Sequence, residues 1–466
     1  MSNPTAHVEE GQVSTNFPIR QLPREILSEV FVECLPDTTE AHWMSTHSAP
    51  LLLCGVCSSW RALALATPQL WSRVGIYIND STVDASIGVG VTRDWLNRSG
   101  SLPLMLRLRH KPCFSFATSR PALVEDILST FCIHASRWQD VTLDLEGCPP
   151  IIFPRLGTLP LLRAFRLEAS QHLVIGLPFS ASPRLTRLSW PFPFSAPINP
   201  QIPWSQMTHL HIAMGTTLFA ALETIRLCPL LQEFEVDMRR APVIRALPRG
   251  PIVENRHLRK LDIVVHEDCG LLFDSLTLPA LTELTLDTDS DYAYRGRLFP
   301  VPSVHKSLLN LLTRSNCELD KLGLIDCGFS ASAFLECLEH PSLRTLSLLK
   351  VENVYNQPML TDDVLLRLTD LPSPPSPPVL LPKLAHLILE MCLAASPEML
   401  GRMVYSRRCA CDEDEDDEGQ LKVFSLVARK LNERDEVYID KAFANGLDAA
   451  ITYDEYATGE DDAAVP

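Results

Sequence analysis

The stretch that decides the fold runs from residue 258 to residue 286, LRKLDIVVHEDCGLLFDSLTLPALTELTL, and one apolar spacing occurs in it twice. Each copy has an apolar residue, two variable residues, a second apolar residue, one variable residue and a third apolar residue: Leu258/Leu261/Ile263 and Leu281/Leu284/Leu286. Side chains that alternate in this way belong to a short strand with one face in a core. The residues between the copies must carry the chain back to begin a parallel strand.

The same triplet occurs eleven times in the sequence. Its other copies are Trp138/Val141/Leu143, Leu162/Phe165/Leu167, Leu185/Leu188/Trp190, Met207/Leu210/Ile212, Leu231/Phe234/Val236, Leu319/Leu322/Leu324, Leu343/Leu346/Leu348, Leu384/Leu387/Leu389 and Leu421/Phe424/Leu426. The first positions advance by 24, 23, 22, 24, 27 and 23 residues, then by 38, 24, 41 and 37. The early steps match the period of leucine-rich repeats. The later ones indicate insertions, at residues 371–382 (LPSPPSPPVLLP) and 409–420.

Several of the returning segments have helical spacing. Residues 216–229, TTLFAALETIRLCP, place apolar residues on one helical face between threonines and a proline, and Ser307 and Ser332 are candidate N-caps of two later helices. The sequence therefore predicts an α/β leucine-rich-repeat solenoid over residues 138–431, with parallel strands on its concave face and helices on its convex face. An ordinary α/β domain is the alternative, but it does not keep one period over six steps. Two less regular triplets predict atypical capping repeats over residues 72–137.

Composition and charge restrict the class of protein. The chain has 466 residues, 46% of them hydrophobic, and a net charge of −16, which argues against a nucleic-acid partner. From Cys409 onward there are 17 acidic and five basic residues, so most of the charge falls at the C-terminal end. We expect disorder over residues 1–16 and an acidic tail over residues 432–466. No apolar run reaches the roughly 18 residues of a membrane helix. We therefore expect an intracellular protein, cytoplasmic or nuclear, that does not bind a membrane.

Residues 17–71 form a different module. FPIRQLPREILSEVFVECLP (17–36) and APLLLCGVCSSWRALALATPQLW (49–71) each predict an amphipathic helix. The run LPREILSEVF, the later VCSSWR and the terminal LW closely resemble the F-box, in the form found in fungal proteins with degenerate leucine-rich repeats. WLNRSGSLPL (95–104) and SRWQDVTLDL (136–145) are similar to that family too. The alternative is that the two helices merely cap the solenoid.

The resemblance implies docking on the Skp-type adaptor of a cullin-RING ubiquitin ligase. Carried over position by position, the adaptor-facing residues are Leu22, Pro23, Ile26, Leu27, Val30, Phe31, Val56, Cys57, Trp60, Leu70 and Trp71. The link over residues 35–50 is longer than in the compact F-box. The chain is then predicted to be the substrate-recognition subunit of the ligase. The alternative is an interaction scaffold without a ligase link.

We find no sequence pattern for catalysis. Cys54 and Cys57 form a CxxC without a second pair or a His at zinc-finger spacing, and no phosphate loop or nucleophile elbow is present. We therefore expect neither an enzyme nor a metal or other cofactor. A hydrolase with an unrecognised site is the remaining enzymatic alternative.

Partner selection must then depend on the concave face of the solenoid. On three successive strands its acidic residues are Glu233, Glu235, Asp237, Asp262, Glu283 and Asp287, against the single base Lys260. This predicts a negative patch that attracts a basic segment of a partner protein. The alternative is an ordinary solvated strand face.

Overall fold

The protein is described here by a computed structural model. The described residues are 19, 22–36, 44–79, 88–111, 121–145, 148, 156–169, 179–191, 202–212, 215–238, 252–265, 269–288, 304–353, 358–370, 379–409 and 420–453. The chain divides into two compact units, an N-terminal unit of residues 1–162 and 169–181 and a C-terminal unit of residues 163–168 and 182–466. Residues 1–16 and most of the two predicted insertions (371–378 and 410–419) lie outside the described residues.

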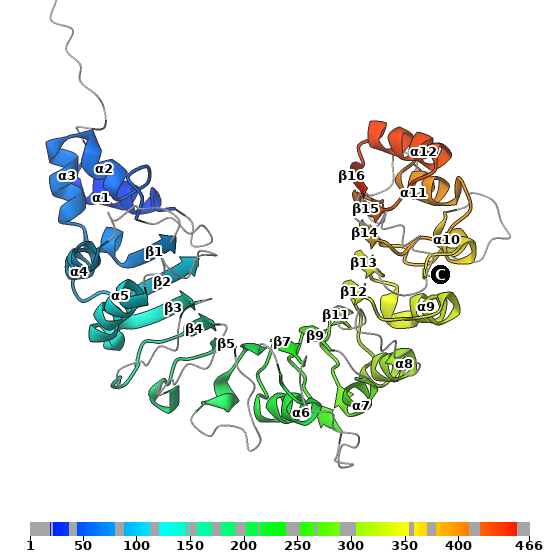
Figure 1. Ribbon diagram of the computed structural model, residues 1–466, viewed down its shortest axis with the longest axis horizontal. Helices are drawn as coiled ribbons and strands as arrows, with labels where there is room; N and C mark the ends of the chain where they lie inside the picture. Colours follow the sequence, from blue (N-terminus) through cyan, green and yellow to red (C-terminus); the bar gives the residue numbers. More distant parts are fainter. Residues whose placement is uncertain are drawn as a thin grey trace, which may run out of the picture. The chain divides into compact units, whose positions relative to one another are not determined.

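The N-terminal unit begins with three short helices and continues with strand and helix in alternation. Its elements are α1 (Arg24–Glu33), α2 (Leu51–Val56), α3 (Ser58–Leu65), η2 (Pro68–Trp71), β1 (Arg73–Asn79), α4 (Val89–Arg98), β2 (Leu104–Lys111), α5 (Pro121–Ile133), η3 (Ala135–Arg137), β3 (Trp138–Asp144) and η4 (Phe179–Ala181). β1 pairs with β2 and β2 with β3, both in parallel. Figure 1 shows α4 and α5 along one side of these strands.

The C-terminal unit is a longer run of the same kind. Its main strands are β4 (Ala164–Glu168), β5 (Arg187–Trp190), β6 (His209–Ile212), β7 (Glu233–Asp237), β9 (Lys260–Val264), β11 (Glu283–Asp287), β12 (Lys321–Ile325), β13 (Leu348–Glu352), β14 (His386–Glu390), β15 (Val423–Ala428) and β16 (Asp448–Tyr453). They pair in parallel in chain order. β8 (Val253–Glu254) and β10 (Leu276–Thr277) form a separate two-stranded ladder.

Helices return the chain between most of these strands. They are η5 (Trp204–Gln206), α6 (Leu218–Leu227), α7 (Gly270–Asp274), α8 (Val304–Ser315), α9 (Ala331–Leu338), η7 (Pro341–Leu343), α10 (Asp362–Leu368), α11 (Met399–Cys409) and α12 (Glu433–Ala444). Within the C-terminal unit, the strands line the inner side of a curve and the helices lie outside it (Figure 1). The predicted α/β class with parallel strands is confirmed, and the arrangement is compatible with a solenoid.

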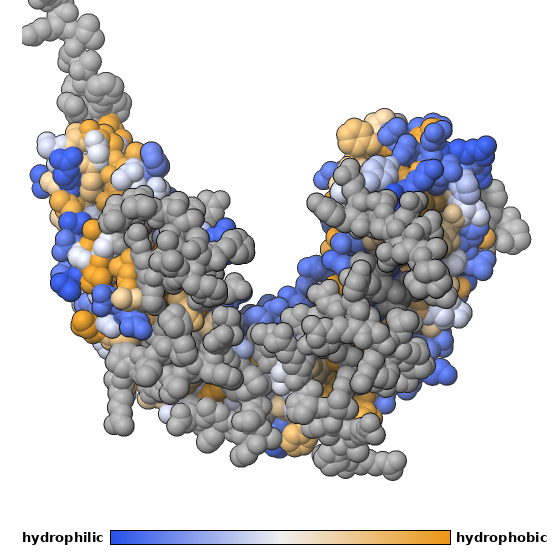
Figure 2. Space-filling view, viewed as in Figure 1, coloured by the Kyte–Doolittle hydropathy of each residue, from blue (hydrophilic) through white to orange (hydrophobic). Residues whose placement is uncertain are grey.

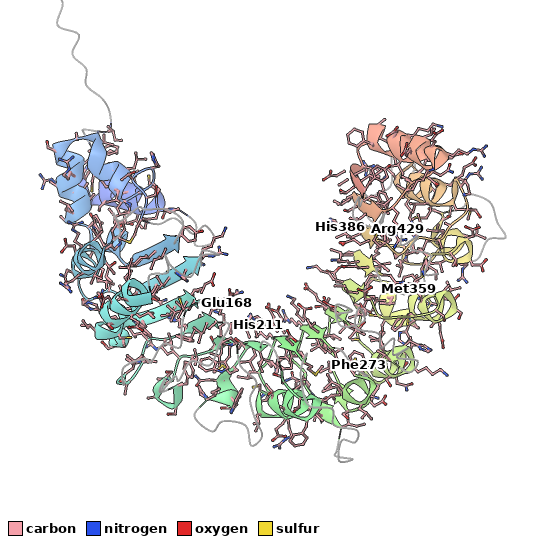
Figure 3. The ribbon with its side chains drawn as sticks, in the orientation of Figure 1. Glu168, His211, Phe273, Met359, His386 and Arg429 are labelled. Atoms are coloured by element: carbon pink, nitrogen blue, oxygen red, sulfur yellow. The ribbon has the colours of Figure 1, made fainter. Side chains whose placement is uncertain are left out.

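The core consists of columns of apolar side chains in register. Across β5 to β15 one column is Leu188, Leu210, Phe234, Leu261, Leu284, Leu322, Leu349, Leu387 and Phe424. Each of these side chains is buried, as are the leucines that precede the strands. Since no single repeat can cover its apolar face, stacking of neighbouring repeats provides the burial. Figure 3 shows Phe273 and Met359 on the helix side and His211 and His386 on the inner, strand side.

Buried polar side chains also join neighbouring repeats. The Asn255 amide donates to the carbonyl of Cys228 at 2.9 Å, and its carbonyl oxygen accepts from two backbone N–H groups. The hydroxyl of Ser315 accepts from the N–H of Leu278 at 2.9 Å. These bonds pair backbone groups that would otherwise be buried without partners.

Three sequence expectations about the repeats are wrong. β13 pairs Leu349 and Val351 with the core positions of β12, so this triplet begins three residues later than expected, at Leu346, and Leu348 faces outward. Two adjacent leucines made both registers fit the pattern, and packing against β12 selects one of them. The N-cap of α9 is Ser330 and not the expected Ser332. Ser307, the other expected N-cap, is a buried residue inside α8.

Two further corrections concern the ends of the chain. The second predicted helix is two helices, because Cys57 adopts an extended conformation (φ −161°, ψ 170°) between α2 and α3. The predicted acidic tail is ordered over much of its length, since α12 and β16 add a strand–helix unit in parallel with β15. Ile439 and Ala442 bury the apolar stripe of α12, which the acidic composition of the segment concealed. Residues 454–466 of this tail lie outside the described residues.

Candidate protein-interaction surfaces

Helix α1 has two apolar stripes with opposite environments. Leu27 and Phe31 are buried, whereas Leu22, Ile26 and Val30 are 40%, 51% and 42% exposed. Ile26 and Val30 lie four residues apart in α1 and therefore share a face, and Leu22 is exposed two residues before the helix begins. A helix needs only one apolar stripe to pack on its own protein. The second stripe is surplus to the fold of the described residues.

The buried stripe attaches α1 to α3. The rings of Phe31 and Trp60 lie 4.9 Å apart between centroids. Further along the chain, the indole N–H of Trp71 donates to the carbonyl of Ala64 at 2.8 Å, and its ring lies 4.8 Å from that of Trp95 in α4. The N-terminal helices thus pack onto the first strand–helix repeat of their unit through Trp71.

Helix α2 also exposes apolar side chains. Leu52 and Val56, four residues apart, are 51% and 56% exposed. Cys57 ends this helix and caps the next one, because its sulfur accepts from the N–H of Trp60 at 3.4 Å. Figure 2 shows hydrophobic residues gathered over α1–α3. We call Leu22, Ile26, Val30, Leu52 and Val56 the N-terminal apolar surface.

The structure divides the predicted adaptor-facing residues by environment. Six are exposed: Leu22, Pro23, Ile26, Val30, Val56 and Cys57. Trp60 is half-buried, and four form the interior of the module: Leu27, Phe31, Leu70 and Trp71. Sequence reasoning did not assign Leu52 to this surface. Its position four residues before Val56 is the signal that could have found it.

The strand face of the C-terminal unit carries the six predicted acids at adjacent positions. Register places Glu235 opposite Asp262, and Lys260 between Glu233 and Glu283. The Lys260 ammonium lies 2.9 Å from Asp262, and Lys321 of β12 lies 2.8 Å from Glu283. The hydrogen bonds that both lysines donate to these carboxylates raise the pKa of the lysines.

The remaining acids of this set lie near histidines or are partly buried. His209 and His211 of β6 lie 3.5 and 3.9 Å from Glu233 and Glu235. Asp237 is only 7% exposed, and Asp287 is half-buried. Lys321 of β12 continues the row Glu233, Lys260 and Glu283, in which acid and lysine alternate, and the count over three strands had omitted it. With both lysines among them, the six acids form a surface that is less negative than that count suggested.

The cysteines of the described residues are free. Burial raises the pKa of the Cys132, Cys228, Cys337 and Cys392 thiols to about 12, which keeps them protonated and unreactive at neutral pH. Of the CxxC pair, Cys54 is half-buried and Cys57 is exposed.

The described residues hold neither a candidate metal site nor a candidate membrane span. They contain no group of three or more His, Cys, Asp or Glu placed to hold a metal ion. In the same part of the chain, the helices all fall short of the length and apolar character that crossing a membrane requires.

Comparison with known proteins gives no family. A scan against protein-family models finds no match, and a search among curated proteins finds no significant relative. The surfaces described above are therefore the basis for a functional argument.

Proposed function

We propose that this chain is the substrate-recognition subunit of a cullin-RING ubiquitin ligase. In this proposal α1–α3 are an F-box that docks on a Skp-type adaptor, and the strand–helix repeats are a leucine-rich solenoid that binds the target. The N-terminal apolar surface is the observation that carries it. An exposed apolar face on short helices is typical of a protein-interaction site.

The two stripes of α1 support docking over a purely capping role. A cap needs the stripe of Leu27 and Phe31, which is buried against the chain itself. It does not need Leu22, Ile26 and Val30, which remain largely in contact with solvent. Those three belong to the run LPREILSEVF, on which the F-box resemblance depends.

The chain itself performs no bond chemistry in this proposal. Docking holds the captured protein near the ubiquitin-carrying subunit, and this proximity raises the effective concentration of the target for transfer. An interaction scaffold without a ligase link shares the repeats and differs only in what contacts α1–α3.

Adaptor binding by matched valine variants tests the proposal. Val30 in α1 and Val91 in α4 are 42% and 43% exposed, so aspartate at either position places a charge at an equally exposed helical site. The intact chain should bind a purified Skp-type adaptor, and Val30→Asp should weaken binding more than about tenfold because a carboxylate replaces buried apolar contact. Val91→Asp should bind as the intact chain does.

Thermal unfolding of both variants is measured alongside binding. Equal loss of adaptor binding in the two variants would contradict the assignment of the surface. Failure of the intact chain to bind any Skp-type adaptor would leave the scaffold function in its place.

A further inference from the structure

The outward faces of β13, β14 and β15 form a grid of nine side chains in the C-terminal unit. Its three cross-strand rows are Leu348/His386/Val423, Lys350/Ile388/Ser425 and Glu352/Glu390/Val427. All nine are half-buried, between core residues on the same strands. Figure 3 shows His386 on the inner side of β14, where these positions lie.

This grid is more apolar than the strand face that precedes it. Four of its nine residues are aliphatic: Leu348, Ile388, Val423 and Val427. On β7, β9, β11 and β12 only Val264 and Ile325 are aliphatic among twelve outward positions. The aliphatic side chains on β13–β15 are not required by the core, because Leu349, Leu387 and Phe424 already fill it. Clustered apolar residues rimmed by polar ones are characteristic of protein-binding surfaces.

The charge of the grid is also unbalanced. The Lys350 ammonium lies 3.2 Å from Glu352 and 3.3 Å from Glu390, which are opposite each other on adjacent strands. Two carboxylates thus share one ammonium. On the earlier strands Lys260 and Lys321 likewise pair with Asp262 and Glu283, and Glu233 and Glu235 lie near His209 and His211.

The pKa of Glu352 reflects this arrangement. Burial raises the pKa of its carboxyl, and the neighbouring Glu390 adds to the increase, against the hydrogen bond from Lys350. Desolvation lowers the pKa of Lys350, but its bonds and charge interactions with the two carboxylates outweigh this and leave the pKa raised. A second cation at Glu352 and Glu390 would therefore meet an uncompensated negative charge.

We propose that the faces of β13–β15 are the partner-binding site of the solenoid, and that the partner segment joins an aliphatic side chain to a neighbouring Arg or Lys. The aliphatic group packs on Leu348, Ile388 and Val423, and the cation binds Glu352 and Glu390. This deepens the proposed function, on whose partner-binding role it rests. It places the site on the far side of β12 from the acids on β7, β9 and β11 that sequence reasoning selected.

The grid has the dimensions of a short peptide contact. Adjacent strands lie about 4.8 Å apart and residues along a strand rise about 3.3 Å, so three strands and five residues span about 10 by 13 Å. Such an area accommodates the side chains of a few consecutive residues. Since Glu352 and Glu390 lie in one edge row and Leu348, Ile388 and Val423 in the two neighbouring rows, the basic and aliphatic groups of the partner must be close in its sequence.

The test selects random 12-residue peptides displayed on phage against the full-length chain. Enriched peptides should combine Leu, Ile or Val with Arg or Lys within a few positions. A synthetic copy of one should bind about tenfold or more weakly to Glu390→Gln and to Ile388→Thr, because each variant removes one of the two contacts. Binding should also weaken with added salt, since one contact is ionic.

Matched controls lie on the same sheet face. Glu283→Gln changes a carboxylate of nearly equal exposure, 31% against 30% for Glu390, and Val264→Thr changes a half-buried outward aliphatic residue on β9. Both should keep binding within about twofold. Loss of binding in Glu283→Gln, with Glu390→Gln unaffected, would place the site on β7–β11 and overturn the proposal.

Other results of the peptide selection also test the proposed binding site. Enriched peptides without basic residues, or no enriched peptide at all, would refute the proposed partner chemistry. Skp-type adaptor binding is measured on the same preparations. Adaptor binding without peptide binding refutes only this inference, whereas peptide binding without adaptor binding refutes only the ligase link.

Discussion

Arg407 of α11 is a buried cation whose removal should destabilise the repeats that end in β13–β15. Its side chain is 4% exposed. The guanidinium donates to the carbonyls of Leu368 and Leu381, each at 2.7 Å, and to that of Leu380. It therefore joins the end of α10 to the segment that leads into β14. We predict the effect of Arg407→Met, which keeps an apolar stem and removes every donor.

The magnitude follows from two opposing contributions. The carbonyls of Leu368 and Leu380 lose the guanidinium, at about 1–3 kcal/mol each, whereas that of Leu381 still accepts from the N–H of Leu384 and loses one hydrogen bond, at about 1 kcal/mol. In the other direction, burial lowers the pKa of Arg407 to about 10, which corresponds to roughly 3 kcal/mol against holding the charge there. The difference leaves a net loss of about 2 kcal/mol.

The assay compares urea unfolding of Arg407→Met with that of Arg402→Met. Arg402 lies on the same helix, but its side chain is 58% exposed and pairs with Glu398 at the surface, so the control should lose at most about 0.5 kcal/mol. Because repeats can unfold in parts, amide exchange should locate the loss in β14 and its neighbours. Equal stability of the two variants would refute the argument, since water would then be replacing the guanidinium at the carbonyls.

Three further predictions concern stability. Gly401→Ala should destabilise the last repeats by about 1–3 kcal/mol in thermal unfolding, because a Cβ there would lie 2.6 Å from the carbonyl oxygen of Asp435. As a control, Gly55→Ala has open space around it and should instead stabilise α2 by up to about 1 kcal/mol. Asn255→Ala should lose about 2–4 kcal/mol in urea unfolding with its three hydrogen bonds, and an unchanged midpoint would show that water replaces them. The pKa of Glu352 is raised in the folded state, so the stability that its carboxyl contributes is present at low pH and lost as the pH rises through the raised pKa. Glu352→Gln should therefore be at least as stable as the parent at pH 7 and lose that advantage below about pH 4. A Gln variant that is less stable than the parent at pH 7 would contradict this.

The repeating core was accessible from the sequence because it depends on short-range spacing. A strand places every second side chain on one face, so Leu258, Leu261 and Ile263 identify both a strand and its buried side. Repetition of that spacing at a nearly constant step identified the parallel stacking. Where the spacing fits twice, with triplets that begin at Leu343 or at Leu346, the sequence did not distinguish the registers.

The stripes of α1 show the same limit at the N-terminus. Helical spacing places Ile26 and Val30 on one face and Leu27 and Phe31 on the next, and all four are equally apolar. Only contact with Trp60 determines which stripe is interior. The sequence therefore identified the module, and the packing identified the surface left for a partner.

Charge on the strand face depended entirely on tertiary structure. Lys321 is 38 residues from Glu283 along the chain, yet register places them opposite each other on adjacent strands. A count of acids along three strands could not include it. The sequence by itself determined which residues form strands and which side of each is buried, because these follow from local periodicity. Which outward residues meet across strands, and hence where the surplus charge and apolar area lie, was decided by the alignment of repeats of unequal length.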